Sequence, residues 1–266
     1  MIDLAHSLAS GQSFTWKRHG ETFVGVANGK LVKCTQQGDC VVGEGAPKAF
    51  FDDYFRANDD FDGIKQELQQ DLVLSKPISC YPGLRILRQD PWECALSFAC
   101  SPLNNVKRIT LMLSNLRKAY GKEKQAFGVT EHLFPMPGQV LDAGEESLRK
   151  LGFGFRARFA FELAKAVEEN GLELNSLRKK DYETASAELL QVHGIGEKVA
   201  DCILLFSCDK LEAFPVDVWI DRVMRSNYRI RKKGPKGARA FGMKKFGENA
   251  GYAQQWLYHA TRNGVV

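Results

Sequence analysis

The sequence lacks the patterns of a membrane span and of a secretory signal. No run of eighteen apolar residues occurs in its 266 residues, and a membrane-spanning helix needs roughly 20. The chain starts MIDLAHSLASGQSF, with an acid at position 3 and neither the basic start nor the apolar run of a signal peptide. We therefore expect neither a membrane span nor secretion. Internal repeats and low-complexity tracts are also missing.

Closely spaced cysteine pairs are missing as well. The seven cysteines form an odd set without CxxC spacing, at positions 34, 40, 80, 94, 100, 202 and 208. A disulfide framework normally uses an even number of cysteines, and zinc or iron–sulfur sites normally use close pairs. We therefore predict free thiols, no such metal site, and an intracellular, reducing location.

Acidic residues are scarce in the C-terminal two thirds of the chain. Residues 1–77 contain 8 Lys and Arg against 11 Asp and Glu, so the rest must carry a net charge of about +8 to give the total of +5. The segment RIRKKGPKGARAFGMKK, at 229–245, has eight basic residues and no acid. Such a run suits phosphate contact and is equally typical of a solvated loop.

Residues 1–77 are predicted to form a small α+β domain. The segments FVGVA, KLVKCT and CVVG are short and extended, and Asn28-Gly29 between the first two is a two-residue hairpin signal. An antiparallel sheet should result, and the aromatic residues of APKAFFDDYFRA recur at the spacing of a helix that packs on it. The prolines and glycine of LSKPISCYPG, at 74–83, indicate a linker.

Residues 78–266 are predicted to form a larger, all-helical domain, so the fold class is α+β. The segment DPWE at 90–93 combines a helix N-cap, a first-turn proline and a glutamate at the third helical position. Apolar residues at spacings of three and four predict further helices around 106–116, 163–167 and 185–189.

A helix-hairpin-helix is predicted in LLQVHGIGEKVADCILLF, at 189–206. One helix ends near Gln191, the turn HGIG follows, and the second helix starts at about Glu197. Glycines let the turn backbone approach another molecule, and the unpaired N–H groups of the helix start suit an anion such as a DNA phosphate. Helix pairs of purely structural role share this pattern.

Lys198 lies in the first turn of this second helix, where the positive end of the helix dipole disfavours an ammonium group. It shares a helix face with Cys202, whereas Val199 and Ile203 belong to the face that should enter the core. Partial burial and positive surroundings favour the neutral, nucleophilic amine. The alternative is a surface lysine without a chemical role.

Asp217 precedes the apolar residues of the next helix, in AFPVDVWIDRVM, which is the pattern of a helix N-cap. A capping carboxylate can also face a cleft and stabilise a developing cation. A lysine that attacks carbon and a carboxylate that supports an oxocarbenium-like sugar can together cleave an N-glycosidic bond through a Schiff base. Lys198 and Asp217 are therefore the candidate catalytic residues.

Six separated segments resemble the helix-hairpin-helix DNA glycosylase superfamily and, within it, the 8-oxoguanine DNA glycosylases. They are GQSFTW (11–16), LRILRQDPWECALSFACS (84–101), LRKLGFGFRAR (148–158), VHGIGEKVADC (192–202), FPVDVW (214–219) and GYAQQWLY (251–258). The four-cysteine cluster typical of the endonuclease III and adenine glycosylase branches is absent. The resemblance implies a monomeric DNA glycosylase and AP lyase that acts on 8-oxoguanine in double-stranded DNA without a cofactor, in the nucleoid or nucleus.

The resemblance also implies roles for individual residues. Lys198 attacks C1′ of a flipped nucleotide and expels the base, β-elimination follows at the abasic site, and Asp217 stabilises the developing charge. The Gly11 carbonyl and Gln254 read the edges of the lesion base. The two stacking walls beside that base are Cys202 and Tyr258, where Tyr258 replaces an expected phenylalanine.

Further implied roles concern the DNA backbone. DNA phosphate contacts are implied at Gly194, Gly196 and Val218, and a structural monovalent cation at the carbonyls of Leu190, Val192 and Ile195. His193 stands where the turn commonly has proline, and Trp219 stands where a phosphate-contacting histidine is usual. Phosphate binding is therefore expected to differ in detail.

The opposite strand is the last feature that the resemblance covers. Arg108 and Arg156 are expected to contact the cytosine left unpaired after flipping, and Phe155 to act as a wedge. Leu103 occupies the position of an asparagine, so it offers no hydrogen bond to cytosine. Two alternatives stay open: an alkylated-base glycosylase of the same fold, and a helix-hairpin-helix module that binds DNA without chemistry.

Overall fold

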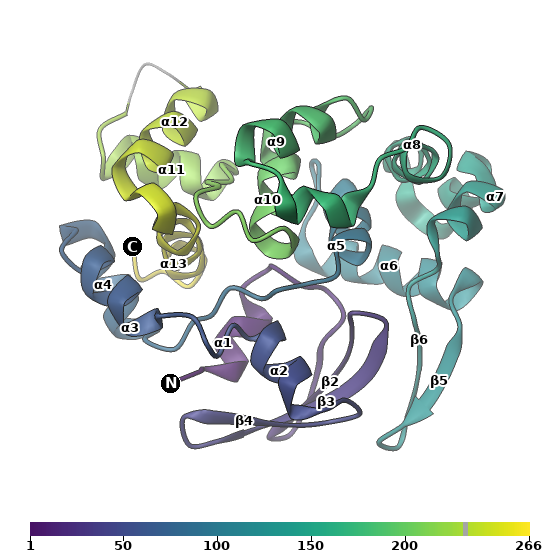
Figure 1. Cartoon of the computed structure of the whole chain (residues 1–266), viewed down its shortest axis with the longest axis horizontal. Helices are drawn as coiled ribbons and strands as arrows, with labels where there is room; N and C mark the ends of the chain where they lie inside the picture. Colours follow the sequence, from purple (N-terminus) through teal and green to yellow (C-terminus); the bar gives the residue numbers. More distant parts are fainter. Residues whose placement is uncertain (231–233) are drawn as a thin grey trace.

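The computed structural model describes residues 1–230 and 234–266 and confirms the α+β fold class. A four-stranded sheet lies at one end of the molecule, and the rest consists of helices and one two-stranded hairpin (Figure 1). None of the helices in these two ranges is long and apolar enough to span a membrane.

The N-terminal sheet is the predicted antiparallel meander, with its strands in chain order. The strands are β1 (Lys17–His19), β2 (Thr22–Ala27), β3 (Lys30–Gln37) and β4 (Cys40–Glu44). Asn28 and Gly29 have φ angles of +48° and +72°, which a two-residue hairpin turn of this kind requires. Helices α1 (Leu4–Ala9) and α2 (Lys48–Tyr54) share an apolar core with the sheet, in which Leu4 and Tyr54 are almost fully buried.

The remaining elements are mostly helical, as predicted. They are α3 (Phe61–Leu68), α4 (Leu72–Cys80), α5 (Pro91–Ala99), α6 (Val106–Tyr120), β5 (Glu123–Ala126), β6 (Val129–His132), α7 (Pro137–Leu148), the π-helical turn η1 (Arg149–Phe153), α8 (Arg156–Glu168), the 3-10 helix η2 (Leu174–Lys179), α9 (Tyr182–Leu190), α10 (Glu197–Ser207), α11 (Val218–Ser226), α12 (Gly234–Phe246), the 3-10 helix η3 (Gly247–Asn249) and α13 (Ala250–Arg262).

The linker expected at 74–83 is wrong over its first part. Helix α4 continues to Cys80 and contains Pro77, which is buried, so this proline lies within a packed helix and marks no break. Helix α4 packs against α13 near the C-terminus. The domain boundary between residues 77 and 78 stays a prediction. Helix α4 extends across this boundary, and its contacts with α13 join the two predicted domains.

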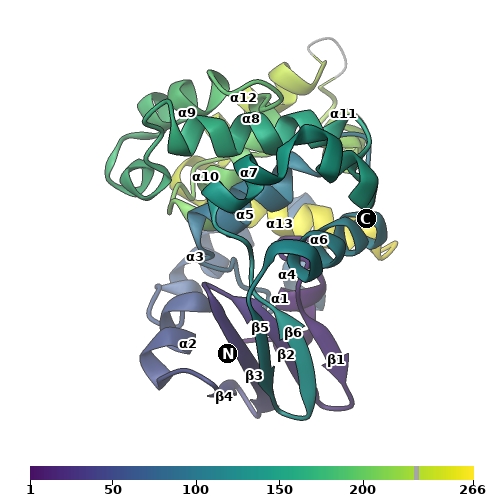
Figure 2. The same ribbon diagram turned by 90° about the vertical axis from the view of Figure 1, so that its right-hand side faces the viewer.

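A β-hairpin interrupts the part of the chain that was expected to be wholly helical. Strands β5 and β6 pair through a turn in which Phe127 and Gly128 have φ angles of +56° and +73°. A left-handed phenylalanine is uncommon, so Phe127-Gly128 is not a strong turn signal. The hairpin extends alongside the N-terminal sheet (Figure 2), where Lys17 forms an ion pair with Glu131.

The start of α5 is bonded to the hairpin turn between β2 and β3. As predicted, Asp90 is the N-cap and accepts hydrogen bonds from the N–H groups of Trp92 and Glu93, both at 3.0 Å. The Glu93 carboxylate accepts from the N–H groups of Asn28 (3.0 Å) and Gly29 (2.8 Å). In a capping box, by contrast, this side chain would accept from the N–H group of the N-cap residue of its own helix. The Asn28 side chain in turn accepts from the Asp90 N–H at 2.6 Å. These bonds hold the sheet to the helical part.

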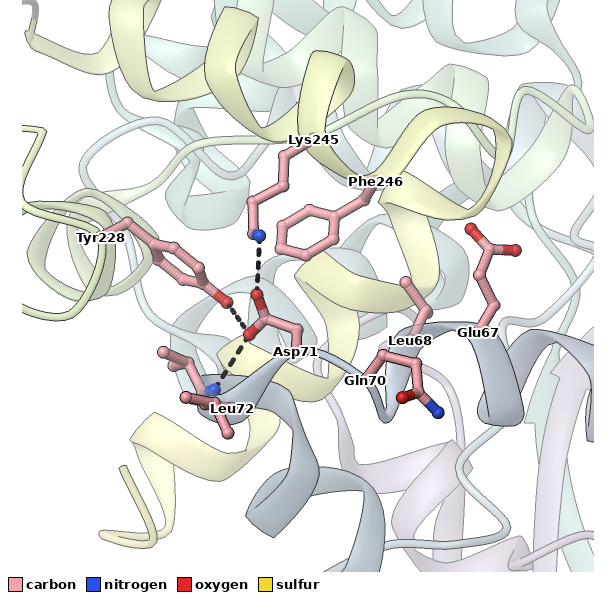
Figure 3. A pocket seen from close by; sticks show the side chains of 9 residues that line it. Glu67, Leu68, Gln70, Asp71, Leu72, Tyr228, Lys245 and Phe246 are labelled. Atoms are coloured by element: carbon pink, nitrogen blue, oxygen red, sulfur yellow. Dashed lines mark hydrogen bonds and ion pairs between the residues drawn. The ribbon is translucent and has the colours of Figure 1, made fainter.

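The basic segment 229–245 is largely part of the folded structure. Arg239, on α12, forms an ion pair with Asp201 of α10, whose side chain is fully buried. Lys245 donates to Asp71 at the start of α4 across 2.9 Å, and the Tyr228 hydroxyl donates to the same carboxylate at 2.7 Å (Figure 3). These two cations therefore hold helices together, while Lys232 and Lys233 lie outside the described residues.

Glu93 generates a testable pH dependence of stability. Burial and the nearby Asp90 raise the pKa of Glu93 to about 7, although two backbone N–H groups oppose the shift. The folded chain therefore binds this proton more tightly than the unfolded chain, so the stabilisation is complete below the unfolded pKa of about 4.3 and is lost as the pH rises through 7. Glu93→Gln should remove about 1 to 3 kcal/mol of this pH dependence.

The measurement is urea unfolding at pH 5 and pH 8. Glu21→Gln is the matched control, because the Glu21 side chain is 89% exposed and should leave the wild-type pH dependence in place. An identical loss of stability between the two pH values in wild type and Glu93→Gln would contradict the expectation.

Candidate active site and DNA-facing surface

One pocket brings together the two predicted catalytic residues and the four predicted base-binding residues. Its lining residues are Gly11, Phe98, Lys198, Cys202, Phe206, Pro215, Asp217, Gln254, Gln255 and Tyr258. They come from the loop after α1, from the neighbouring helices α5 and α10 (Figure 1), from the segment before α11, and from α13. Segments from both ends of the chain therefore build the site.

Lys198 is half-buried in the first turn of α10, as the sequence predicted. Its Nζ donates a hydrogen bond to the Ser101 Oγ across 3.1 Å and lies 5.4 Å from the centre of the Phe98 ring. Cys202 follows one turn later on the same side and is 3% exposed. Burial raises the pKa of the Cys202 thiol to about 12, against the opposing effect of Lys198, so the thiol is neutral.

Asp217 is the N-cap of α11 and also lines the pocket. One carboxylate oxygen accepts from the N–H groups of Trp219 (3.0 Å) and Ile220 (2.9 Å). Burial raises the pKa of Asp217, whereas these N–H groups and Lys198 favour the carboxylate. Both capping bonds use Oδ1, so the N-cap role of Asp217 is compatible with the chemical role predicted for it, which stays a prediction.

Two adjacent glutamines of α13 meet the loop after α1. Gln255 donates to the Ser10 carbonyl across 3.0 Å, next to Gly11, which has a φ of +76°. Gln254 is 4% exposed, and its Oε1 has no hydrogen-bond partner among the described residues. A buried amide oxygen without a partner is costly, so this group suits a ligand that donates a hydrogen bond in the pocket.

Tyr258 closes the pocket beside Gly11. A Cβ atom added at Gly11 would lie only 3.0 Å from the Tyr258 hydroxyl, so glycine is needed for this close approach. Burial raises the pKa of Tyr258, and Arg262, whose Nη1 lies 3.4 Å from the hydroxyl, opposes the shift.

The helix-hairpin-helix turn joins α9 to α10, and its two glycines differ. Gly194 has a φ of +93°, and a Cβ there would lie 2.1 Å from the Phe159 ring. Gly196 is the N-cap of α10 and has open space around its Cβ position. Gly194 is therefore needed for folding of the turn, whereas Gly196 leaves the helix start accessible.

Other predicted backbone contacts lie at the start of α11 and in this turn itself. Val218 is 75% exposed in the first turn of α11, and beside it Arg222 lies 5.2 Å from the centre of the Trp219 ring. The Val192 carbonyl accepts from the Ile195 N–H at 3.0 Å. The predicted cation at the carbonyls of residues 190, 192 and 195 stays a prediction.

The residues predicted to face the opposite strand form a second cluster. Leu103 is 92% exposed with a φ of +50°, Phe155 is 45% exposed, and Arg108 is exposed at the start of α6. Arg156 is 3% exposed and donates to the carbonyls of Pro102 (2.7 Å) and Leu103 (2.6 Å). Arg156 thus holds the Leu103 loop, a contact that the sequence did not predict.

Several pocket residues were missed from the sequence. Phe98 and Phe206 stack with ring centres 5.5 Å apart, and Pro215 and Gln255 complete the wall. Their apolar or amide side chains fit ordinary core positions, and the only signal was that Phe98, Pro215 and Gln255 lie in three of the six segments that resemble the family.

Two models of known protein families match this chain. Residues 1–95 match the family model described as the N-terminal domain of 8-oxoguanine DNA glycosylase, and residues 97–248 match that of the HhH-GPD superfamily of base excision DNA repair proteins. The chain belongs to the 8-oxoguanine DNA glycosylase family. The N-glycosylase/DNA lyase OGG1 of Arabidopsis thaliana is 33% identical over an alignment of 283 residues. This alignment covers 97% of this chain and 77% of that protein.

Solved structures of this family have the same fold. The 8-oxoguanine glycosylase/lyase of Clostridium acetobutylicum, in complex with double-stranded DNA containing cytosine opposite 8-oxoguanine, superposes with a TM-score of 0.95 at 32% identity, over 100% of this chain and 93% of that one. A 3-methyladenine DNA glycosylase of Archaeoglobus fulgidus superposes with a TM-score of 0.77 at 18% identity, covering 98% of this chain and 97% of that one. The second likeness concerns the fold alone.

The two turn glycines allow a paired test. Gly194→Ala should destabilise the protein by about 2 kcal/mol or more, because the side chain would be forced into Phe159 at a positive φ. Gly196→Ala should cost at most about 1 kcal/mol but weaken binding to duplex DNA several-fold, since its methyl group would crowd a phosphate at the helix start.

Denaturant unfolding and fluorescence anisotropy with a labelled duplex measure the two effects. Wild-type DNA affinity in Gly196→Ala would show that phosphate does not approach this turn.

Proposed function

We propose that this protein excises 8-oxoguanine from duplex DNA through a Schiff base on Lys198 and then cleaves the abasic site by β-elimination. The observation that carries the proposal is the single pocket in which Lys198, Asp217 and the unpartnered Gln254 oxygen meet. The family membership supplies the lesion and the reaction class. No chemical step requires a cofactor.

Lys198 and Asp217 divide the chemistry. The neutral amine attacks C1′ while the bond from C1′ to the base breaks, and the bonding electrons leave with the base, which takes up a proton. The Asp217 carboxylate stabilises the positive charge that develops on the sugar. The nitrogen then loses a proton while the C1′–O4′ bond of the sugar breaks and O4′ takes up a proton, which gives the imine. Loss of a proton from C2′ of this imine breaks the C3′–O bond and expels the 3′ phosphate, and hydrolysis of the imine frees Lys198.

The pocket walls supply base recognition. A flipped base would stack between Cys202 and the ring of Tyr258, with its edges toward Gly11 and Gln254. The N7 hydrogen that distinguishes 8-oxoguanine from guanine needs an acceptor, which the Gly11 carbonyl provides. Gln254 offers both a donor and an acceptor to the pairing edge, and the base would satisfy its buried oxygen.

The residues around the pocket suit contact with duplex DNA. The backbone at Gly194, Gly196 and Val218 would contact phosphate on the lesion strand, with a monovalent cation on the turn carbonyls. Phe155 would enter the opposite strand as a wedge, with Arg108 and Arg156 near the unpaired cytosine. The protein would act as a monomer in the compartment that holds the DNA.

Replacement of Lys198 tests the proposed function. Lys198→Gln should abolish base excision and borohydride trapping on a duplex with a single 8-oxoguanine, because the amine is the nucleophile. DNA affinity should stay measurable, because the turn contacts use the backbone. Lys210→Gln is a matched control on the segment after α10, where Lys210 donates to the Arg178 carbonyl across 3.0 Å. Normal excision by Lys198→Gln would remove Lys198 from the mechanism.

Leu103 generates a prediction on the opposite base. The wild type should prefer cytosine with reduced discrimination, because leucine donates no hydrogen bond and one lost bond is worth about 0.5 to 1.5 kcal/mol. Leu103→Asn should raise selectivity several-fold without loss of stability, since asparagine tolerates the positive φ at this position.

Single-turnover excision opposite C, T, G and A measures this selectivity. Two outcomes would contradict the account: a wild type that already rejects every partner but cytosine by orders of magnitude, or an asparagine variant that is less selective.

A further inference from the structure

Ser101 is the polar neighbour of the Lys198 amine on α5's side of the pocket. Its Oγ lies 3.1 Å from Nζ, and its own N–H donates to the Phe98 carbonyl at 2.9 Å, just after α5 ends. Lysine has four rotatable side-chain bonds, so an amine at the end of this chain needs a partner to occupy one position. Ser101 supplies that partner from a different segment of the chain.

The backbone that follows Ser101 is rigidly held. The buried guanidinium of Arg156 bonds the carbonyls of Pro102 and Leu103 at 2.7 Å and 2.6 Å. The Asn104 side chain adds a bond to the Cys100 carbonyl at 2.9 Å, which closes the loop onto the end of α5. Ser101 therefore lies inside a short, braced loop and should move together with it.

The same loop presents Leu103 to solvent. The leucine is 92% exposed and has a positive φ, which is uncommon for a branched side chain and persists only when its surroundings enforce it. An exposed leucine at the tip of a braced loop suits insertion into a gap in stacked bases. Any displacement of the tip would be passed across two residues to the Ser101 hydroxyl.

We propose that Ser101 is a positioning residue that holds the Lys198 amine and ties its placement to the loop that faces the base opposite the lesion. This inference rests on the proposed function of Lys198 and Leu103. A loop seated correctly against cytosine keeps the hydroxyl within reach of Nζ, and a partner base that displaces the loop withdraws it. Selectivity for the opposite base then acts on the chemical step as well as on binding.

The test compares wild type, Ser101→Ala, Ser101→Thr and Ser97→Ala in single-turnover excision of 8-oxoguanine opposite C and opposite A. Ser101→Ala should slow excision opposite C about tenfold and opposite A much less, so that the C-to-A rate ratio falls several-fold, while duplex affinity stays within about twofold. Ser101→Thr keeps a hydroxyl and should restore most of the rate. A variant with only a structural defect would lose rate equally opposite C and opposite A. Its C-to-A rate ratio would stay at the wild-type value, and a hydroxyl at position 101 would not restore the rate.

Ser97→Ala is the matched control, because the Ser97 hydroxyl donates to the Glu93 carbonyl at 2.6 Å within α5. It should keep the wild-type ratio. If Ser101→Ala melts at a lower temperature than Ser97→Ala, Ser101→Cys replaces it with a side chain of nearly the same shape, and the same reduction is expected.

Wild-type rates in Ser101→Ala, or an equal loss opposite C and A, would overturn the inference. Neither result would contradict the proposed function, provided that the wild type is trapped on the lesion duplex by borohydride. Failure of that trapping would overturn the proposed function itself.

Discussion

The buried ion pair between Asp201 and Arg239 fixes the helix on which the site is built. Asp201 is fully buried on α10, three residues after Lys198, and Arg239 reaches it from α12 at 2.6 Å. Loss of one partner from such a pair typically costs about 3 to 5 kcal/mol, because the other charge is left buried and alone. The pair holds α10 against α12, so the orientation of the face with Lys198 and Cys202 depends on it.

Three groups at the pocket reach this helix from distant segments, and each of the three is held by a bond to backbone. Gln255 joins α13 to the Ser10 carbonyl, Asp217 is held by the first N–H groups of α11, and Ser101 is held at the end of α5. Backbone bonds leave little freedom to the attached segments. The pocket is therefore pre-organised before DNA arrives, which is the arrangement that favours reaction over binding alone.

The sequence predicted the parts of this site that depend on local chemistry. Lys198 in a first helical turn and Asp217 as an N-cap follow from spacing within a single segment. It missed Ser101 and the loop bonds of Arg156, because their partners lie 97 and 54 residues away in the chain. The β5–β6 hairpin was missed because a turn with a left-handed phenylalanine is uncommon. The linker at 74–83 was wrong over its first part, because the packing of α4 outweighs the proline signal.

Asp217 shows why a strong structural explanation does not exclude a chemical one. The two N–H groups that cap α11 approach one carboxylate oxygen and favour its charged form, against the burial that raises the pKa of Asp217. The capping bonds therefore oppose the proton uptake that burial favours for this carboxyl. The charge-stabilising role proposed for Asp217 would therefore depend on the same two bonds as its capping role.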